Sequence, residues 1–151
     1  VREGEVGVGS LQLYVPPAEG SNFFTMRETH EAELVRMAVF DLVVNNADRK
    51  AGACLLGDDG RIWGVDHGLT FNVDVKLRTV IWDFSGEPIP EHLMAALVDL
   101  TARLESPQGQ LLELLEQLLP EEIVALKDRI QWVLGEGTYP GLPGRRRRRY
   151  Q

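Results

Sequence analysis

The sequence predicts an α+β fold in which a small β-hairpin packs on a mostly helical layer. Two short apolar runs in residues 54–65 flank a Gly-Asp-Asp-Gly turn, which is typical of a hairpin. A helical pattern precedes the hairpin, from Met26 to about Asn45. Three more helical patterns follow it, at 90–104, at 108–119 and from 120 to about 134. The C-terminal half is therefore expected to be a layer of helices.

The helix ahead of the hairpin is expected to be largely buried. Thr25 can act as its N-cap, with Glu28 three residues later as the capping-box partner. Its apolar side chains form a broad surface: Leu34, Met37, Ala38, Phe40, Leu42 and Val44. Residues 45–48 read Asn-Asn-Ala-Asp, which favours a turn and should end the helix.

Composition divides the chain into three parts. Residues 1–22 are interpreted as a hinge-like strand and loop, with the strand at 10–15 stopped by two prolines. Residues 23–137 form the expected body. Residues 138–151 read as a Pro/Gly- and Arg-rich tail that we expect to be disordered. The chain begins with Val1 rather than Met, which is typical of a fragment or a processed product.

The balance of charged residues bears on nucleic-acid binding. The 151 residues carry 16 Lys+Arg against 23 Asp+Glu, and without Arg145–Arg149 the balance is 11 − 23 = −12. Such an acidic body argues against a broad nucleic-acid-binding face, because those faces need clustered basic residues. The basic tail could contact anionic lipid or nucleic acid, although a solvated end is the interpretation we favour.

The composition also bears on membrane insertion and on disulfide bonds. No run of 18 apolar residues occurs, so no integral membrane segment is expected. The single cysteine, Cys54, lies in an apolar run and is interpreted as a core residue. It excludes an internal disulfide, and a reducing cytoplasm is the expected compartment.

Two polar loops flank the predicted hairpin and carry the chemistry. Asp48, Arg49 and Lys50 follow the buried helix, and Asp66 follows the second strand. Because a hairpin reverses the chain, Asp48 and Asp66 can converge across 18 positions of sequence. Phosphoryl transfer needs a carboxylate near the attacking hydroxyl, a metal held against the phosphates, and positive charge on the transferred group. Lys50 could supply that charge to a γ-phosphate.

The same two loops resemble a known family. Residues 46–50 (NADRK) and 65–69 (VDHGL) resemble the phosphatidylinositol 3- and 4-kinase-like family, and more closely an actinobacterial branch of uncharacterised proteins grouped with it. That family carries a D-R-x-x-x-N loop followed by D-F-G or D-N-G. Residues 74–82 and 9–13 also resemble the branch, the latter at the hinge between lobes. The resemblance covers about residues 8–135, but only the two loops are diagnostic.

The resemblance implies a protein-kinase-like C-lobe and a role for each loop residue. Asp48 would orient or deprotonate the acceptor hydroxyl, and Asp66 would bind Mg²⁺ or Mn²⁺ that bridges the phosphates of ATP. Arg49 would brace the loop by ion pairing, and Lys50 would contact a phosphate. The phosphate acceptor stays open between a lipid head group, a protein and a small molecule.

The remaining site residues come with two departures from the family. Tyr14 and Val15, near the hinge, could line the adenine pocket. The position five residues after Asp48 is Ala53, where the family places a metal-binding Asn or His, so Asn46 is the candidate substitute. Too few residues precede Ser10 for an N-lobe, which is therefore largely absent from this chain.

Two hypotheses follow. The first is an ATP-dependent phosphotransferase that is inactive as this isolated chain. The second is a non-catalytic, pseudokinase-like binding or interaction module that keeps the core for its shape. Asp48 alone would be read as an ordinary turn residue, and Asp66 with the following His-Gly is equally weak alone. The pair, placed around a hairpin after a buried helix, favours the kinase-like interpretation.

Overall fold

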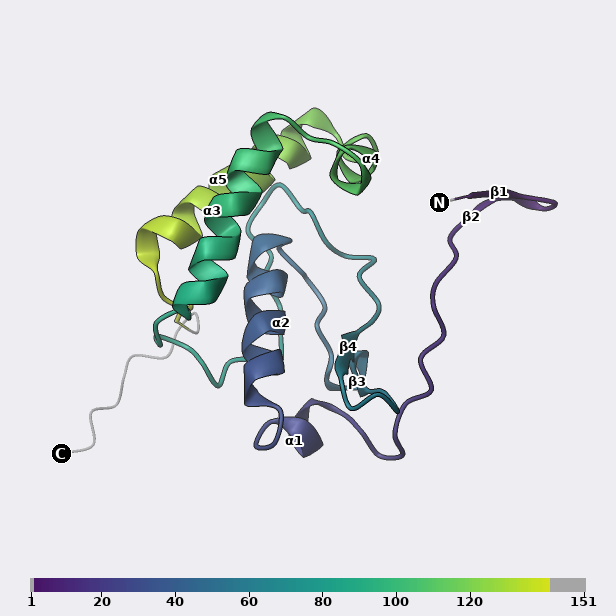
Figure 1. Cartoon of the computed structure of the whole chain (residues 1–151), viewed down its shortest axis with the longest axis vertical. Coiled ribbons are helices and arrows are strands. Elements are labelled where there is room, and N and C mark those ends of the chain that lie inside the picture. Colours follow the sequence, from purple (N-terminus) through teal and green to yellow (C-terminus); the bar gives the residue numbers. More distant parts are fainter. Residues whose placement is uncertain (1, 142–151) are drawn as a thin grey trace.

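Helix α2 (Glu31–Val43) lies at the centre of the fold, as the computed structural model of residues 2–141 shows (Figure 1). On one side it contacts helix α5 (Pro120–Glu136), and on the other it contacts a β-hairpin. The hairpin pairs β3 (Cys54–Leu56) with β4 (Ile62–Gly64) in antiparallel register, Leu55 opposite Trp63. These elements confirm the α+β class and the predicted hairpin.

The helical layer contains three elements and covers one side of α2. Helix α3 (Glu91–Glu105) packs against α5, and the short α4 (Gln110–Leu115) connects them. Leu97, Ile130 and Val133 are among the buried residues that join this layer to the core. Helix α5 starts with Pro120, whose missing N–H costs nothing in a first turn, and ends at Gly137 in the left-handed region.

The helix predicted from Met26 begins five residues later. Residues Phe23–Met26 instead form a separate turn, α1, whose N-cap is Asn22: its side-chain Oδ1 accepts a hydrogen bond from Phe24 N at 2.9 Å. Thr25 is the partner within this capping box, because its hydroxyl accepts from Asn22 N. The prediction that Thr25 caps the long helix was therefore wrong. Helix α4 is also shorter than the 108–119 that we expected.

The N-terminal segment differs most from expectation. Its strands are β1 (Arg2–Gly4) and β2 (Gly7–Gly9), which pair with each other, whereas the predicted strand at 10–15 has no partner. Figure 1 shows this segment extending away from the body. It joins the body at Pro17 and Ala18, where Ala18 N donates to Leu56 O at 2.8 Å.

Thr138, Tyr139 and Pro140 belong to the packed body rather than to a disordered tail. Tyr139 is 6% exposed, packs against Phe84, and donates its hydroxyl hydrogen to Val35 O at 3.0 Å. Residues 138–140 therefore do not belong to the disordered tail that we expected from residue 138, and Arg145–Arg149 lie outside the described residues. Within residues 2–141, no helix combines the length and apolar character needed to cross a bilayer.

Removal of the Tyr139 side chain should test this anchor. We expect Tyr139→Ala to lower the free energy of unfolding by about 3–5 kcal/mol, because an aromatic side chain leaves a cavity in the core. Urea unfolding followed by circular dichroism would measure it. Tyr14→Ala is the matched control, since Tyr14 is 80% exposed and its loss should change stability by less than about 0.5 kcal/mol. Equal effects of the two substitutions would refute the anchor.

Candidate functional site

The first polar loop is fixed to its neighbours where α2 ends. Asn45 adopts a left-handed backbone conformation (φ 53°), which Asn tolerates better than most residues, and so ends the helix. Its side-chain amide donates to Asn72 O and Asp74 O, and its Oδ1 accepts from Lys76 N at 2.9 Å. The loop after the hairpin is therefore tied to the loop before it.

A fully buried ion pair lies beneath the two loops. Arg49 donates from Nε and Nη2 to the two carboxylate oxygens of Asp41, each at 2.8 Å, and both side chains are shielded from water. Asn46 Nδ2 donates to the same carboxylate at 2.9 Å. Burial by itself would lower the pKa of Arg49, but the hydrogen bond and charge of Asp41 outweigh it and raise the pKa. Arg49 therefore stays charged.

The remaining Arg49 nitrogen fixes the two ends of the hairpin relative to each other. Nη1 donates to Ala53 O at 3.1 Å, ahead of β3, and to Val65 O at 3.0 Å, after β4. Val65 N also donates to Ala53 O at 3.0 Å. Asp66 follows Val65 directly, so this clamp sets the position of Asp66 with respect to the loop that carries Asp48. The predicted bracing role of Arg49 agrees with this geometry.

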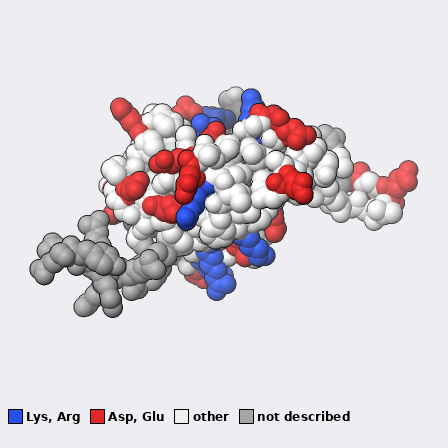
Figure 2. Space-filling model, turned by 90° about the horizontal axis from the view of Figure 1, so that it is seen from below, with Lys and Arg blue, Asp and Glu red and all other residues white. Residues whose placement is uncertain are grey.

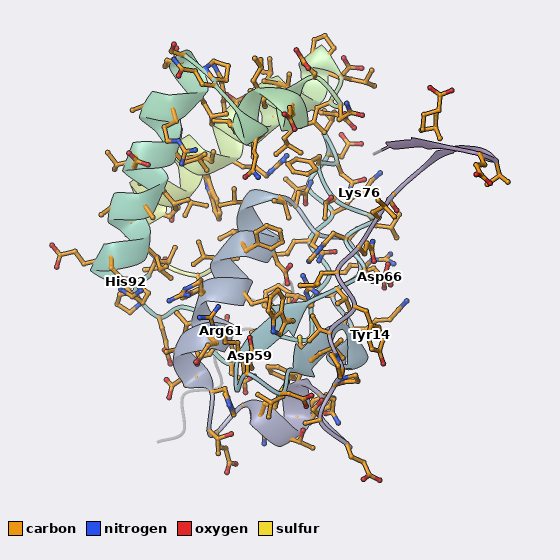
Figure 3. The ribbon with its side chains drawn as sticks, turned by 45° about the vertical axis from the view of Figure 1, so that its right-hand side comes forward. Tyr14, Asp59, Arg61, Asp66, Lys76 and His92 are labelled. Carbon is orange, nitrogen blue, oxygen red and sulfur yellow. The ribbon has the colours of Figure 1, made fainter. Side chains whose placement is uncertain are left out.

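Three charged side chains gather above the clamp. Lys50 Nζ lies 2.7 Å from Asp48 Oδ2 in a partly exposed ion pair. The hydrogen bond and charge of Asp48 raise the pKa of Lys50, and the charge of Asp66 contributes to the same effect. Asp48 and Asp66 thus act on one ammonium group. Asp66 is exposed. Figure 3 shows it on the same side of the molecule as Lys76, which lies farther along the second loop.

Backbone strain is concentrated at the second loop. Asp66 and Phe71 have φ values of 60°, a conformation that L-residues rarely adopt. Phe71 N donates to Val44 O, and Ala47 N donates to Leu69 O at 2.9 Å, so pairing with the first loop holds this conformation. Strain of this kind costs roughly 1–3 kcal/mol per residue and is often found at functional sites.

His67 and Cys54 lie close to the site without joining its charged group. The His67 ring packs edge-on against Phe40, and burial, followed by the charge of Arg49, lowers its pKa. The Cys54 sulfur contacts Met37 Sδ at 3.5 Å inside the core. Burial raises the pKa of Cys54 to about 11, so the thiol is neutral at ordinary pH.

The structure distributes the other predicted site residues unevenly. Asn46 is fully buried, and its Oδ1 accepts from Asp48 N at 3.0 Å, so in this conformation it holds the loop and presents no free oxygen. Its assignment as a metal ligand stays a prediction. Tyr14 is exposed on the N-terminal segment (Figure 3), and the adenine contacts of Tyr14 and Val15 also stay predictions. Within residues 2–141, no three His, Cys, Asp or Glu side chains gather into a metal cluster.

A large groove lies on another part of the surface, and sequence reasoning missed it. Its cavity volume is about 1270 Å³, between one face of α5 and the loop of residues 69–78. Ala47 and Leu69 line it, but Asp48 and Asp66 do not. The signal in the sequence was the short stretch 75–78 (VKLR), where two apolar and two basic residues alternate.

Comparison with known proteins shows what this chain is similar to. The chain is 34% identical to the protein Rv2133c of Mycobacterium tuberculosis, across an alignment that covers 97% of this chain. The chain spans 64% of the length of that relative. No protein-family model matches the sequence, and no solved structure matches the chain.

The buried pair and the exposed pair should differ strongly in their contribution to stability. We expect Asp41→Ala to cost about 3–5 kcal/mol, because it leaves the Arg49 charge buried without a partner. Asp48→Ala breaks an ion pair that water already screens, so its cost should be at most about 1 kcal/mol. Urea unfolding at neutral pH would compare the two. A loss below 1 kcal/mol for Asp41→Ala would contradict the buried network.

The Cys54 thiol should make stability fall at alkaline pH. Burial raises the pKa of the thiol in the folded state to about 11, so the folded state holds this proton more tightly than the unfolded state. The resulting contribution to the free energy of unfolding is fully present below pH 9 and is lost as the pH rises toward 11. Between pH 8 and 10.5 we expect a loss of about 1–2 kcal/mol from this group. Urea midpoints of the native protein and of Cys54→Ala would isolate it, since the variant should lose less stability over the same interval.

Proposed function

We propose that this chain is the C-lobe of a kinase-like phosphotransferase that uses ATP and a divalent metal ion. The observation that carries the proposal is that Asp48 forms an ion pair with Lys50 and that the charge of Asp66 acts on the same ammonium group. The two carboxylates come from loops on opposite ends of a hairpin, and a buried arginine fixes those loops. The resemblance of both loops to phosphatidylinositol 3- and 4-kinase-like proteins supports the same reaction.

The residues present fit Mg²⁺ or Mn²⁺. Mg²⁺ in phosphotransferases takes one or two carboxylates and completes its shell with substrate phosphates and water, so three protein ligands are not needed. Asp66 is exposed and offers carboxylate oxygens of that kind. A second carboxylate, that of Asp48, is partly exposed and forms an ion pair with Lys50. Bound there, a divalent ion would neutralise charge that develops on the phosphates.

The side chains of this site would divide the work of positioning. Asp48 would accept a hydrogen bond from the acceptor hydroxyl and hold it for in-line attack. Lys50 would exchange its ion pair with Asp48 for a contact to the transferred phosphoryl group, which exposure of both side chains allows. Arg49 would act only through the loops, since its guanidinium is fully engaged in the protein.

One observation favours a second function, a binding or interaction module without catalysis. Ala53, at the position where the resembled family has a metal-binding Asn or His, is 5% exposed and offers only its carbonyl oxygen. That oxygen already accepts from Arg49 and Val65. A domain that kept this clamp but lost its metal would retain the fold and bind partners.

Calorimetry with Mg-ATP separates the two functions. We expect binding by any longer form of the protein that carries residues ahead of Val1, with little or none by this chain. Asp66→Asn should weaken that binding at least about tenfold, because a carboxylate–metal contact is lost while Asn still tolerates the left-handed backbone.

Asp58→Asn is the matched control, since Asp58 lies exposed in the hairpin turn and away from the site. The same titration with ATP and EDTA should show no binding if the ion is required. An absence of Mg-ATP binding by both forms of the protein would refute the phosphotransferase and favour the interaction module.

A further inference from the structure

The groove beside α5 exposes large apolar side chains on both of its walls. Val124 and Trp132 project from α5 and are 58% and 46% exposed. Val73 and Val75, on the opposite loop, are 50% and 86% exposed. Isolated exposed valines are ordinary, but apolar side chains gathered around a cavity of about 1270 Å³ are typical of a binding site.

Positive charge is gathered in the same groove. Within residues 3–141 there are ten Lys and Arg residues, and six of them form ion pairs with carboxylates. The other four are Arg36, Lys76, Arg78 and Arg129, and the last three of these line the groove. Two carboxylates, Glu121 and Asp128, line it as well. Three bases against two acids make the groove basic on a protein whose net charge is −7.

The acidic background makes this local excess notable. Figure 2 shows acidic side chains spread over the face seen from below, with few basic ones between them. An anion approaching that face would be repelled. The groove presents three cations that form no ion pair with a carboxylate of the described residues.

Arg129 places one of these cations beneath the groove surface. Its Nε donates to Val43 O and its Nη1 to Asn72 O, both at 2.9 Å. Nη2 is buried and has no acceptor among the described residues. Burial lowers the pKa of Arg129, with no carboxylate to offset the effect. A partly buried guanidinium held only by carbonyl oxygens is costly, and a nearby anion would reduce that cost.

Lys76 and Arg129 both line the groove and are linked by a chain of hydrogen bonds. Asn72 O accepts from both Arg129 Nη1 and Asn45 Nδ2, and Asn45 Oδ1 accepts from Lys76 N. These bonds link the backbone of Lys76 to the Arg129 guanidinium through one asparagine pair. The exposed Lys76 ammonium can therefore contact an anion while Arg129 supplies fixed positive charge below it.

We propose that this groove binds an anionic amphiphile, a molecule that joins an acyl chain to an anionic head group. The acyl chain would lie against Val124, Trp132 and Val73, and the head group would contact Lys76. The site goes beyond the proposed phosphotransfer, because neither Asp48 nor Asp66 lines the groove. The amphiphile could be a free molecule or a lipid presented by a membrane, and the experiment distinguishes these sources.

Dodecanoate below its micelle concentration is the probe for the free molecule. Titration into the whole chain, followed by calorimetry and tryptophan fluorescence, should give saturable binding. Dodecanol has the same chain without the charge and should bind at least about tenfold more weakly, since a charge-assisted hydrogen bond is lost. Vesicles of phosphatidylcholine with and without phosphatidylglycerol, tested by flotation, are the arm for membrane lipid.

Two matched pairs of variants locate the binding. Lys76→Gln should weaken it about tenfold, whereas Arg36→Gln removes an equally unpaired, exposed cation outside the groove and should leave it unchanged. Val124→Asp puts a carboxylate in the groove and should abolish binding. Val98→Asp makes the same change at an equally exposed helix position, 58%, outside the groove and should have no effect.

Every outcome decides the proposal. Binding of dodecanoate that depends on Lys76 and Val124 supports a free amphiphile. Binding of anionic vesicles alone, with the same dependence, supports a membrane lipid as the source. No binding in either arm, equal binding of dodecanol, or equal effects within each variant pair would overturn it. Circular dichroism of Val124→Asp and Val98→Asp would confirm that both variants are folded.

Discussion

The buried ion pair between Asp41 and Arg49 is the constraint on which the rest of the structure depends. Two charges withdrawn from water require nearly complete hydrogen bonding. The Arg49 guanidinium satisfies this requirement by engaging three parts of the chain: helix α2 through Asp41, the end of the first loop through Ala53 O, and the start of the second through Val65 O. A salt bridge that could have served stability alone therefore also sets the relative positions of two loops.

This arrangement explains how a site can be rigid beneath and adaptable above. Asn45 and Asn46 are almost fully buried, and their side chains form hydrogen bonds with backbone and carboxylate groups. These hydrogen bonds hold the first loop in place. Asp48 and Lys50 lie just above it and are partly exposed, and water screens their mutual attraction. In the proposed phosphotransfer, the charged groups would exchange partners when a phosphate binds, while the buried hydrogen bonds would hold the loops that carry them. Such a division between support and contact is what a phosphotransferase site requires.

The two proposed sites use opposite faces of one short loop sequence. Asn46 and Asp48 are turned toward the buried pair and the charged group, whereas Asn45 and Ala47 line the groove beside α5. The basic residues follow a similar division: Arg49 and Lys50 are paired with carboxylates, and Lys76, Arg78 and Arg129 are not. Three of the four cations that form no ion pair within residues 3–141 thus lie where apolar side chains are also exposed, and this combination, rather than either feature alone, suits an amphiphile.

The sequence by itself determined the elements whose signals are local. The Gly-Asp-Asp-Gly turn predicted the β3–β4 hairpin, and Pro120 predicted the start of α5, because turns and helix starts depend on backbone preferences of single residues. The end of α5, expected near residue 134, lies at Glu136. Thr25 misled for the same reason, since it and Asn22 are both capping residues and only the fold selects one. The position of Asp66 relative to Lys50, the burial of Asn46 and Tyr139, and the groove were decided by the tertiary structure. Each depends on contacts between residues far apart in the chain, such as Tyr139 with Val35, which no local pattern records.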